Sequence, residues 1–269
     1  MHRLFLIAGL LMGGALLVSS AAAADWWSQS AYEDELAFVV GVQTRSMERD
    51  IEGGDVKSGE FESDEDYLRI GLGFGGPGGG QMGLAYLDAG QADVSTTLRM
   101  DKFAAREIET YELDTTEYFA FGLRVLGPLG ADADDTGEGW MLGVALEFAF
   151  WVSADVESVE WQGVEATNVD GEVSATEFQL DLLGGYSFLE GNIRPYAGVR
   201  LSGMNMSVDE LTYTVPGNTF EVDGSVSAED MAGVVGGLEV SLPNDRLALS
   251  VEASVGDADT VVAGLELRF

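Results

Sequence analysis

The sequence predicts a transmembrane antiparallel β-barrel, an all-β fold class, on three observations. Apolar residues recur at every second position in one segment after another, which is the pattern of strands whose side chains point alternately to opposite faces. After residue 24, no apolar run is as long as a membrane-spanning helix requires. The links between the alternating segments are mostly short and long in turn. A chain with these properties crosses a bilayer only as a closed barrel, in which the sheet pairs every backbone polar group.

The alternating segments number ten. The strongest covers 140–152, where Trp140, Leu142 and Val144 begin a run of apolar residues at alternate positions. Eight strands is the alternative, because segment 82–86 and the short final hairpin are the weakest parts of the pattern. In 82–86 we place Met82, Leu84 and Tyr86 on the lipid face. The predicted segments are 36–45, 67–74, 82–86, 118–125, 140–152, 178–188, 196–201, 232–240, 247–255 and 260–269.

The links predict which end of the barrel faces outward, because outer-membrane barrels have short periplasmic turns and longer extracellular loops. The short links are 75–80, 127–139, 189–192 and 243–245. The long links are 46–66, 88–115, 153–176 and 203–230, and they carry 28 of the 47 acidic residues. We therefore expect long acidic extracellular loops, in which strand-like stretches extend the hairpins beyond the membrane.

Both ends of the chain indicate export to a membrane. Residues 1–24 combine a basic start at Arg3, an apolar stretch and small residues before Asp25, as a cleaved secretory signal peptide does. At the other end, Leu265, Leu267 and Phe269 lie on one face of the last predicted strand. The expected organisation is a signal peptide over 1–24, a periplasmic N-terminal segment over 25–34 and a barrel over 35–269.

The alternation that ends at Phe269 resembles the C-terminal signature of bacterial outer-membrane β-barrel proteins. The stretches 184–188 (GGYSF) and 194–201 (RPYAGVRL) are similar to small barrel domains of the porin-like, OmpA-like or OmpW-like superfamily, without pointing to one member. The resemblance implies a Gram-negative outer membrane, contact with membrane lipid and lipopolysaccharide, and recognition of Leu265, Leu267 and Phe269 by the barrel-assembly machinery.

The formal net charge of -34 argues against nucleic acid as a partner, because phosphates would be repelled. The acidic outer loops would attract cations, and divalent cations could bridge their carboxylates to one another or to lipopolysaccharide phosphates. No cofactor is expected, and the chain has no cysteine and only one histidine, His2, which lies in the signal peptide. We therefore expect neither a metal site nor an enzyme that depends on a histidine base.

Charged residues also recur on the face opposite the lipid-facing one. They predict a network of arginine–carboxylate pairs in the lumen, because buried charges require partners. The predicted network comprises Arg45, Arg69, Arg124, Arg194, Arg200, Arg268, Glu147, Asp181, Glu239, Glu252 and Glu266. One function that fits is a narrow cation-preferring channel or passive conduit for small solutes and ions. The alternative is a non-conducting structural or surface-interaction barrel, serving adhesion or envelope integrity, whose lumen is filled by salt bridges.

Overall fold

The computed structural model describes residues 36–53, 56–75, 82–100, 107–113, 115–129, 138–189, 192–228, 231–241 and 247–268. The predicted signal peptide, the segment 25–34 and Phe269 lie outside these residues. Within them, no helix is long and apolar enough to cross a membrane.

The described residues form a single antiparallel sheet of thirteen strands. Their bounds are β1 (Leu36–Gly53), β2 (Val56–Gly75), β3 (Met82–Met100), β4 (Glu107–Leu113), β5 (Thr116–Pro128), β6 (Gly139–Trp161), β7 (Val164–Glu165), β8 (Thr167–Ser187), β9 (Ile193–Val215), β10 (Asn218–Ala228), β11 (Ala232–Ser241), β12 (Leu247–Val255) and β13 (Asp259–Arg268).

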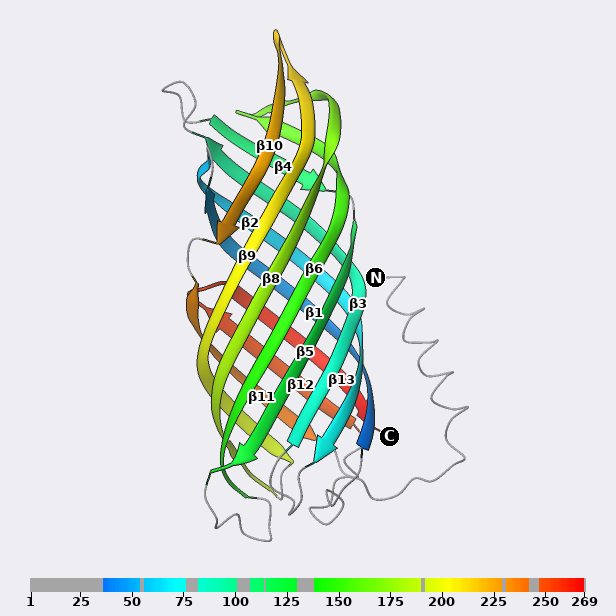
Figure 1. The fold of residues 1–269 in the computed structure, drawn as a ribbon, viewed down its shortest axis with the longest axis vertical. Helices are drawn as coiled ribbons and strands as arrows, with labels where there is room; N and C mark the ends of the chain where they lie inside the picture. Colours follow the sequence, from blue (N-terminus) through cyan, green and yellow to red (C-terminus); the bar gives the residue numbers. More distant parts are fainter. Residues whose placement is uncertain are drawn as a thin grey trace, which may run out of the picture.

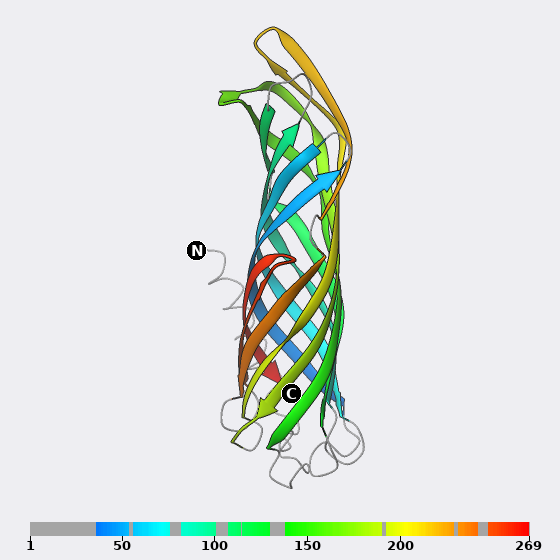
Figure 2. The same cartoon turned by 90° about the vertical axis from the view of Figure 1, so that its left-hand side faces the viewer.

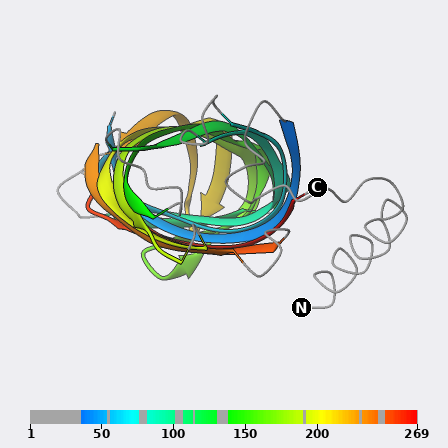
Figure 3. The ribbon, with the colours of Figure 1, turned by 90° about the horizontal axis from the view of Figure 1, so that it is seen from below.

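Ten of these strands close into a barrel: β1, β2, β3, β5, β6, β8, β9, β11, β12 and β13. Each pairs with the next, and β13 returns to β1 from Val39–Arg268 to Glu48–Asp259. Closure leaves no free strand edge, which is the condition for a sheet to lie in lipid. Figure 1 shows the tilted strands of this barrel, and Figure 3 shows the closed ring from below. The prediction of ten strands is confirmed.

Beyond this ring the barrel continues with eight strands. Here β4 takes the place of β5 between β3 and β6, and β10 replaces β11, β12 and β13 between β9 and β1. We call this part the outer section; it comprises 46–53, 56–66, 91–100, 107–113, 153–161, 167–176, 203–215 and 218–228. The ten-stranded remainder is the membrane section. Figure 2 shows the longer strands continuing past the hairpin of β12 and β13.

The outer section is built from residues that the sequence assigned to long extracellular links. Most of them are extended strands rather than loops, and β9 runs without interruption from Ile193 to Val215. The expected strand-like stretch 211–215 is the end of this strand. The predicted long links therefore contain strands that pair with one another and continue the barrel. The alternation of inward and outward side chains goes on in them beyond the last lipid-facing residues.

The outward face of the membrane section is apolar. Exposed side chains encircle it from every strand of the ring, among them Phe38, Ile70, Leu87, Phe121, Leu142, Leu182, Val199, Val234, Val251 and Val261. A continuous exposed apolar surface on a closed barrel is suited to lipid, because water would make it costly. This section is therefore the part that crosses a bilayer.

The third predicted segment has the opposite phase from the one expected. Tyr86 is 8% exposed and points into the barrel, whereas Leu87 is 65% exposed on the outside. The sequence placed Tyr86 and Leu84 toward lipid because both are apolar or aromatic. The hydroxyl of Tyr86 instead donates to Glu147 in the lumen, so its polar end decides its direction.

Candidate functional site in the barrel lumen

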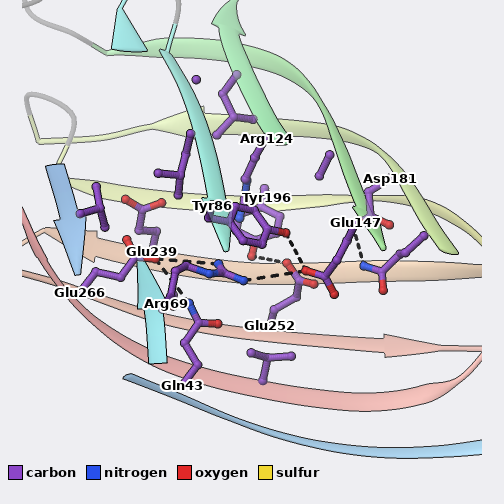
Figure 4. A pocket seen from close by; sticks show the side chains of 18 of the residues that line it. Gln43, Arg69, Tyr86, Arg124, Glu147, Asp181, Tyr196, Glu239, Glu252 and Glu266 are labelled. Carbon is purple, nitrogen blue, oxygen red and sulfur yellow. Dashed lines mark hydrogen bonds and ion pairs between the residues drawn. The ribbon is translucent and has the colours of Figure 1, made fainter. Parts of the chain in front are cut away.

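A cavity of about 160 Å³ lies in the lumen of the membrane section. The space holds on the order of five waters. Ten of the eleven charged residues of the predicted network line it: Arg45, Arg69, Arg124, Arg194, Arg200, Glu147, Asp181, Glu239, Glu252 and Glu266. For the eleventh, Arg268, only the backbone is described, in β13. Figure 4 shows part of the lining.

Arg45 on β1 joins three carboxylates at the outer end of the cavity. Its Nη2 lies 2.6 Å from Oε2 of Glu177 on β8. Its Nε and Nη1 lie 3.7 Å from carboxylate oxygens of Glu65 on β2 and Glu147 on β6. The guanidinium also lies 5.9 Å from the centre of the Trp151 ring. One side chain thus connects strands that are far apart around the barrel.

Arg69 on β2 is held by a carboxylate and by an aromatic ring. Its Nε and Nη2 donate to the two carboxylate oxygens of Asp88 on β3, at 2.9 and 2.8 Å. Its guanidinium carbon lies 3.7 Å from the centre of the Tyr86 ring. The hydroxyl of Tyr86 in turn donates to Glu147 at 2.6 Å, as Figure 4 shows. Two-pronged binding and stacking together fix the plane of this arginine.

Arg200 on β9 forms the second such group. It donates to both carboxylate oxygens of Asp181 at 2.8 Å and to Oε1 of Glu252 at 2.6 Å. Glu252 also accepts a hydrogen bond of 2.7 Å from the hydroxyl of Tyr196. Arg124 stacks on that ring, with its guanidinium carbon 4.5 Å from the ring centre. The group links β5, β8, β9 and β12.

Two further ion pairs between residues of the predicted network complete the lining. Arg194 lies 3.4 Å from Glu239 across the β9–β11 pair, and Arg69 lies 4.0 Å from Glu266 on β13. Glycines of neighbouring strands leave room for these side chains. At Gly237, for example, a Cβ atom would lie 2.4 Å from the Tyr196 ring. The arrangement binds opposite charges to one another and leaves a narrow space between the groups.

Sequence reasoning missed five further buried charges: Arg49, Glu65, Asp88, Glu177 and Asp257. Arg49 and Glu65 follow the inward alternation of their strands, so extending the predicted strands beyond 45 and below 67 would have found them. Asp88 was missed because the inward face of the third segment was assigned wrongly. Glu177 lay just outside a predicted strand, and Asp257 lies in the short turn between β12 and β13, for which period two gives no signal.

Arg49, Asp257 and Ser202 meet where ten strands become eight. Nη2 of Arg49 lies 2.9 Å from Glu177, 3.6 Å from Asp257 and 2.5 Å from the hydroxyl of Ser202. That hydroxyl donates to Asp257 at 2.5 Å. The turn between β12 and β13 is thereby fixed against β1 and β9, below the point where β10 joins β1.

Burial shifts the ionisation of two lumen-facing groups in the outer section. The pKa of Glu65 is raised to about 7, because desolvation of its carboxylate outweighs the attraction of Arg45. The pKa of Arg49 is lowered from its ordinary value, because desolvation outweighs the attraction of Glu177. The described lumen holds six arginines (45, 49, 69, 124, 194 and 200) and nine carboxyl groups (65, 88, 147, 177, 181, 239, 252, 257 and 266), so carboxyl groups outnumber arginines there.

Above the charged groups, an apolar cluster fills the outer section; we call it the outer core. It includes side chains from all eight strands of that section, such as Ile51, Phe61, Leu98, Tyr111, Val159, Val173, Met206 and Val226. Ile51, Phe61 and Tyr111 are 0% exposed, so no water-sized space reaches them. Edge-to-face contacts of Phe61 with Trp151 (5.5 Å between ring centres) and of Trp151 with Tyr118 (5.6 Å) extend the cluster down toward Arg45.

Other predicted site residues are placed as follows. Leu265 is 38% exposed on the outside of β13, and Leu267 is half-buried. Their recognition by an assembly machinery stays a prediction. In the part of the chain that the structure describes, no three or more His, Asp or Glu side chains are grouped to hold a metal ion. Bridging of outer carboxylates by divalent cations likewise stays a prediction.

No protein-family model matches the sequence, and no curated protein matches it. Solved structures with a similar arrangement include the translocator domain of the autotransporter NalP from Neisseria meningitidis, with 12% identity over 99% of this chain and 96% of that chain and a TM-score of 0.43. An outer membrane channel from Pseudomonas putida F1 has 8% identity over 88% and 98%, with a TM-score of 0.41. The toluene transporter TodX of Pseudomonas putida has 11% identity over 93% and 92%, with a TM-score of 0.32.

The architecture of this chain rests on its own geometry. A ring of ten antiparallel strands closes on itself, an apolar surface surrounds it, and charges fill its interior. These are the features of an outer-membrane β-barrel.

Proposed function

We propose that this chain is a non-conducting barrel of the Gram-negative outer membrane, whose role is structural or depends on interactions of its outer section. The observation that carries the proposal is the outer core. Its side chains come from every strand of the eight-stranded ring, and the eight named above are at most 6% exposed. Because eight strands leave an interior only wide enough for side chains, a water path through this level would require the core to come apart.

The charged groups below support the same interpretation. A buried arginine–carboxylate pair is costly to break, because the remaining charge loses its compensation in a dry environment. Arg45 and Arg200 each bind more than one carboxylate, so an ion passing them would compete with several pairs at once. Such a network is suited to holding opposite walls of the barrel together.

Single-channel recording of the refolded, signal-free protein in a planar lipid bilayer tests the proposal. We expect no stepwise conductance from the native sequence. The double substitution Phe61→Ala with Leu98→Ala should introduce leak events, since it opens the outer core. Its matched control, Leu72→Ala with Leu87→Ala, alters exposed side chains of the same two strands on the lipid face. Steady conductance from the native protein would overturn the proposal.

The lumen cavity favours a second candidate function, a passive conduit for small solutes and ions. The cavity of about 160 Å³ is bordered by five arginines and five carboxyl groups, and further buried groups outside its lining make carboxyl groups outnumber arginines in the described lumen. Such a conduit would favour cations over anions. It requires the outer core to rearrange, and cation-selective steps in the same recordings would support it in place of the closed barrel.

A further inference from the structure

The hairpin of β9 and β10 extends beyond the ends of β1 and β2, as Figures 1 and 2 show. Strand β10 pairs with β9 along most of its length, from Asn218 opposite Val215 to Ser227 opposite Asn205. With β1 it shares only two residue pairs, Ile51–Ala228 and Glu52–Ser227. Among the described residues, the stretch 218–226 has no strand on its second side. It is therefore a free strand edge on the outer section.

The turn of the hairpin identifies the backbone groups at this edge. Pro216 and Gly217 form a two-residue turn between the paired residues Val215 and Asn218. In such a hairpin the closing pair exchanges both hydrogen bonds, and the residues that bond to the partner strand then alternate. Asn218, Phe220 and Val222 thus bond to β9. The N–H and C=O groups of Thr219, Glu221, Asp223 and Ser225 point to the free edge.

The two faces of the edge strand differ in chemistry. On the inner face, Phe220 and Val222 are half-buried and pack against the outer core. The ring of Phe220 stacks on Tyr213 at 5.4 Å between centres and lies 5.7 Å from Trp161. On the outer face, Glu221 and Asp223 are exposed. In a strand added here, the inward side chains would lie beside apolar residues of β10. The outward side chains would lie beside the carboxylates of β10.

The edge also lacks the usual protection against pairing. Natural edge strands carry lysine, proline or a bulge that turns the edge away. The segment 218–228 contains neither lysine nor proline. The register of the hairpin shifts between Val222 and Gly224, and the extra residue lies on β9, where Glu210 has a φ of 50°. The edge of β10 is thus not blocked by lysine or proline.

We propose that the free edge of β10 binds an extended segment of a partner polypeptide by strand addition, and that this segment alternates apolar and basic side chains. The apolar residues would cover Phe220 and Val222, and the basic residues would pair with Glu221 and Asp223. Main-chain hydrogen bonds supply affinity in this binding mode, and alternate side chains supply specificity. The inference rests on the proposed function, in which the outer section carries the interactions of the barrel.

A second copy of the chain fits the same edge less well. Two β10 edges related by a twofold axis would pair antiparallel and bring Glu221 and Asp223 near their counterparts. Like charges on opposing strands destabilise a pair. A basic partner strand gains from the same carboxylates.

The binding test uses the full chain folded in lipid nanodiscs and a labelled nine-residue peptide in which valine and lysine alternate. A peptide of alternating valine and glutamate is the probe control. We expect saturable binding of the lysine peptide by fluorescence anisotropy, and at least tenfold weaker binding of the glutamate peptide. Equal binding of the two peptides would overturn the charge assignment.

Four variants separate strand addition from attraction to the acidic surface. Ser225→Pro removes one edge N–H and leaves the β9 pairing intact, so it should weaken binding at least tenfold, whereas Ser225→Ala keeps the N–H and should bind normally. Glu221→Lys with Asp223→Lys should also weaken binding at least tenfold. Glu157→Lys changes an exposed acid on β6 and should stay within twofold. Binding that survives Ser225→Pro in folded protein, or a dimer that forms through this edge and excludes the peptide, would overturn the proposal.

The outcomes also distinguish this inference from the closed barrel. Absent conductance together with absent peptide binding would remove the edge site and leave the closed barrel. Conductance of the native protein together with edge-dependent binding would overturn the closed barrel and leave the edge site.

Discussion

The membrane section and the outer section share six strands, yet their chemistry is inverted. Along β1, the inward side chains change from Gln43 and Arg45 in the membrane section, through Arg49 at the junction, to Ile51 in the outer section. The outward side chains change from Phe38, which is exposed to lipid, to Glu48, which is exposed to water. The alternation itself is not interrupted, because inward residues of β1 stay at odd-numbered positions and outward residues stay at even-numbered positions.

This inversion follows from the solvent on each side. Lipid favours apolar outward residues, which leaves the polar residues for the interior of the membrane section. In water, the outer section needs an apolar interior for its stability, as any soluble barrel does. The boundary between lipid and water can therefore be located on the outward face, at the change from Leu68 to Asp66 on β2 and from Val42 to Thr44 on β1.

The largest expected effect tests the interior of the membrane section. Arg45→Met keeps most of the side-chain volume but leaves Glu177, Glu65 and Glu147 without their shared cation. Removing one partner of a buried charge network costs about 3–5 kcal/mol. Equilibrium urea unfolding in lipid vesicles, followed by tryptophan fluorescence, should detect this loss.

The double variant Arg45→Met with Glu177→Gln provides the control for this prediction. It also removes the nearest uncompensated carboxylate, so part of the lost stability should return. A double variant as unstable as the sum of the two single variants would mean that Arg45 and Glu177 do not act as a pair.

The lumen set illustrates how far sequence periodicity extends. Ten charges that line one cavity could be listed in advance, because parity assigns a face wherever a strand is long and regularly alternating. The same reasoning failed for Arg49 and Glu65, because the apolar outward residues that marked the strands stop at the membrane boundary. It failed for Asp88 because both faces of this segment carry apolar residues, Leu84 and Tyr86 on one face and Ala85 and Leu87 on the other. Alternation therefore could not decide which face points to the lumen.

The outer core could not be predicted from this alternation, for a different reason. Phe61, Leu98 and Met206 lie in acidic segments that the sequence assigned to long links. Their common interior appears only when β4 and β10 enter the ring and reduce it to eight strands. Such pairing between distant segments depends on register, which alternation alone leaves open.

The next prediction compares the two sections through one residue type on one strand. Leu98→Ala in the outer core should cost about 2.7–5 kcal/mol, because the rigid surroundings keep part of the cavity. Leu87→Ala on the lipid face should cost less, about 1.5–3 kcal/mol, because fluid lipid fills the space and only the transfer free energy is lost. Urea unfolding of both variants in vesicles measures the difference. Equal losses would contradict the interpretation of Leu87 as a lipid contact.

The smallest effect concerns pH and the outward face of the outer section. Glu60 lies beside Glu48 and Glu62, and its pKa is raised to about 7 by burial and by its hydrogen bonds to these two carboxyls. The folded state therefore holds a proton that the unfolded chain releases near pH 4.5. This contribution to stability is fully present below pH 4.5 and is lost as pH rises through about 7.

Through Glu60 alone, stability should accordingly fall by about 1 kcal/mol between pH 5 and pH 8, a modest amount because solvent screens charges at this surface. Urea unfolding at four pH values measures the slope, in a Glu65→Gln background because the pKa of the buried Glu65 is also about 7 and would add its own pH dependence. Glu60→Gln should flatten the slope in that background. Stability that rises over this range would mean that the carboxylates of the outer face are compensated by cations, which is the divalent-cation prediction in measurable form.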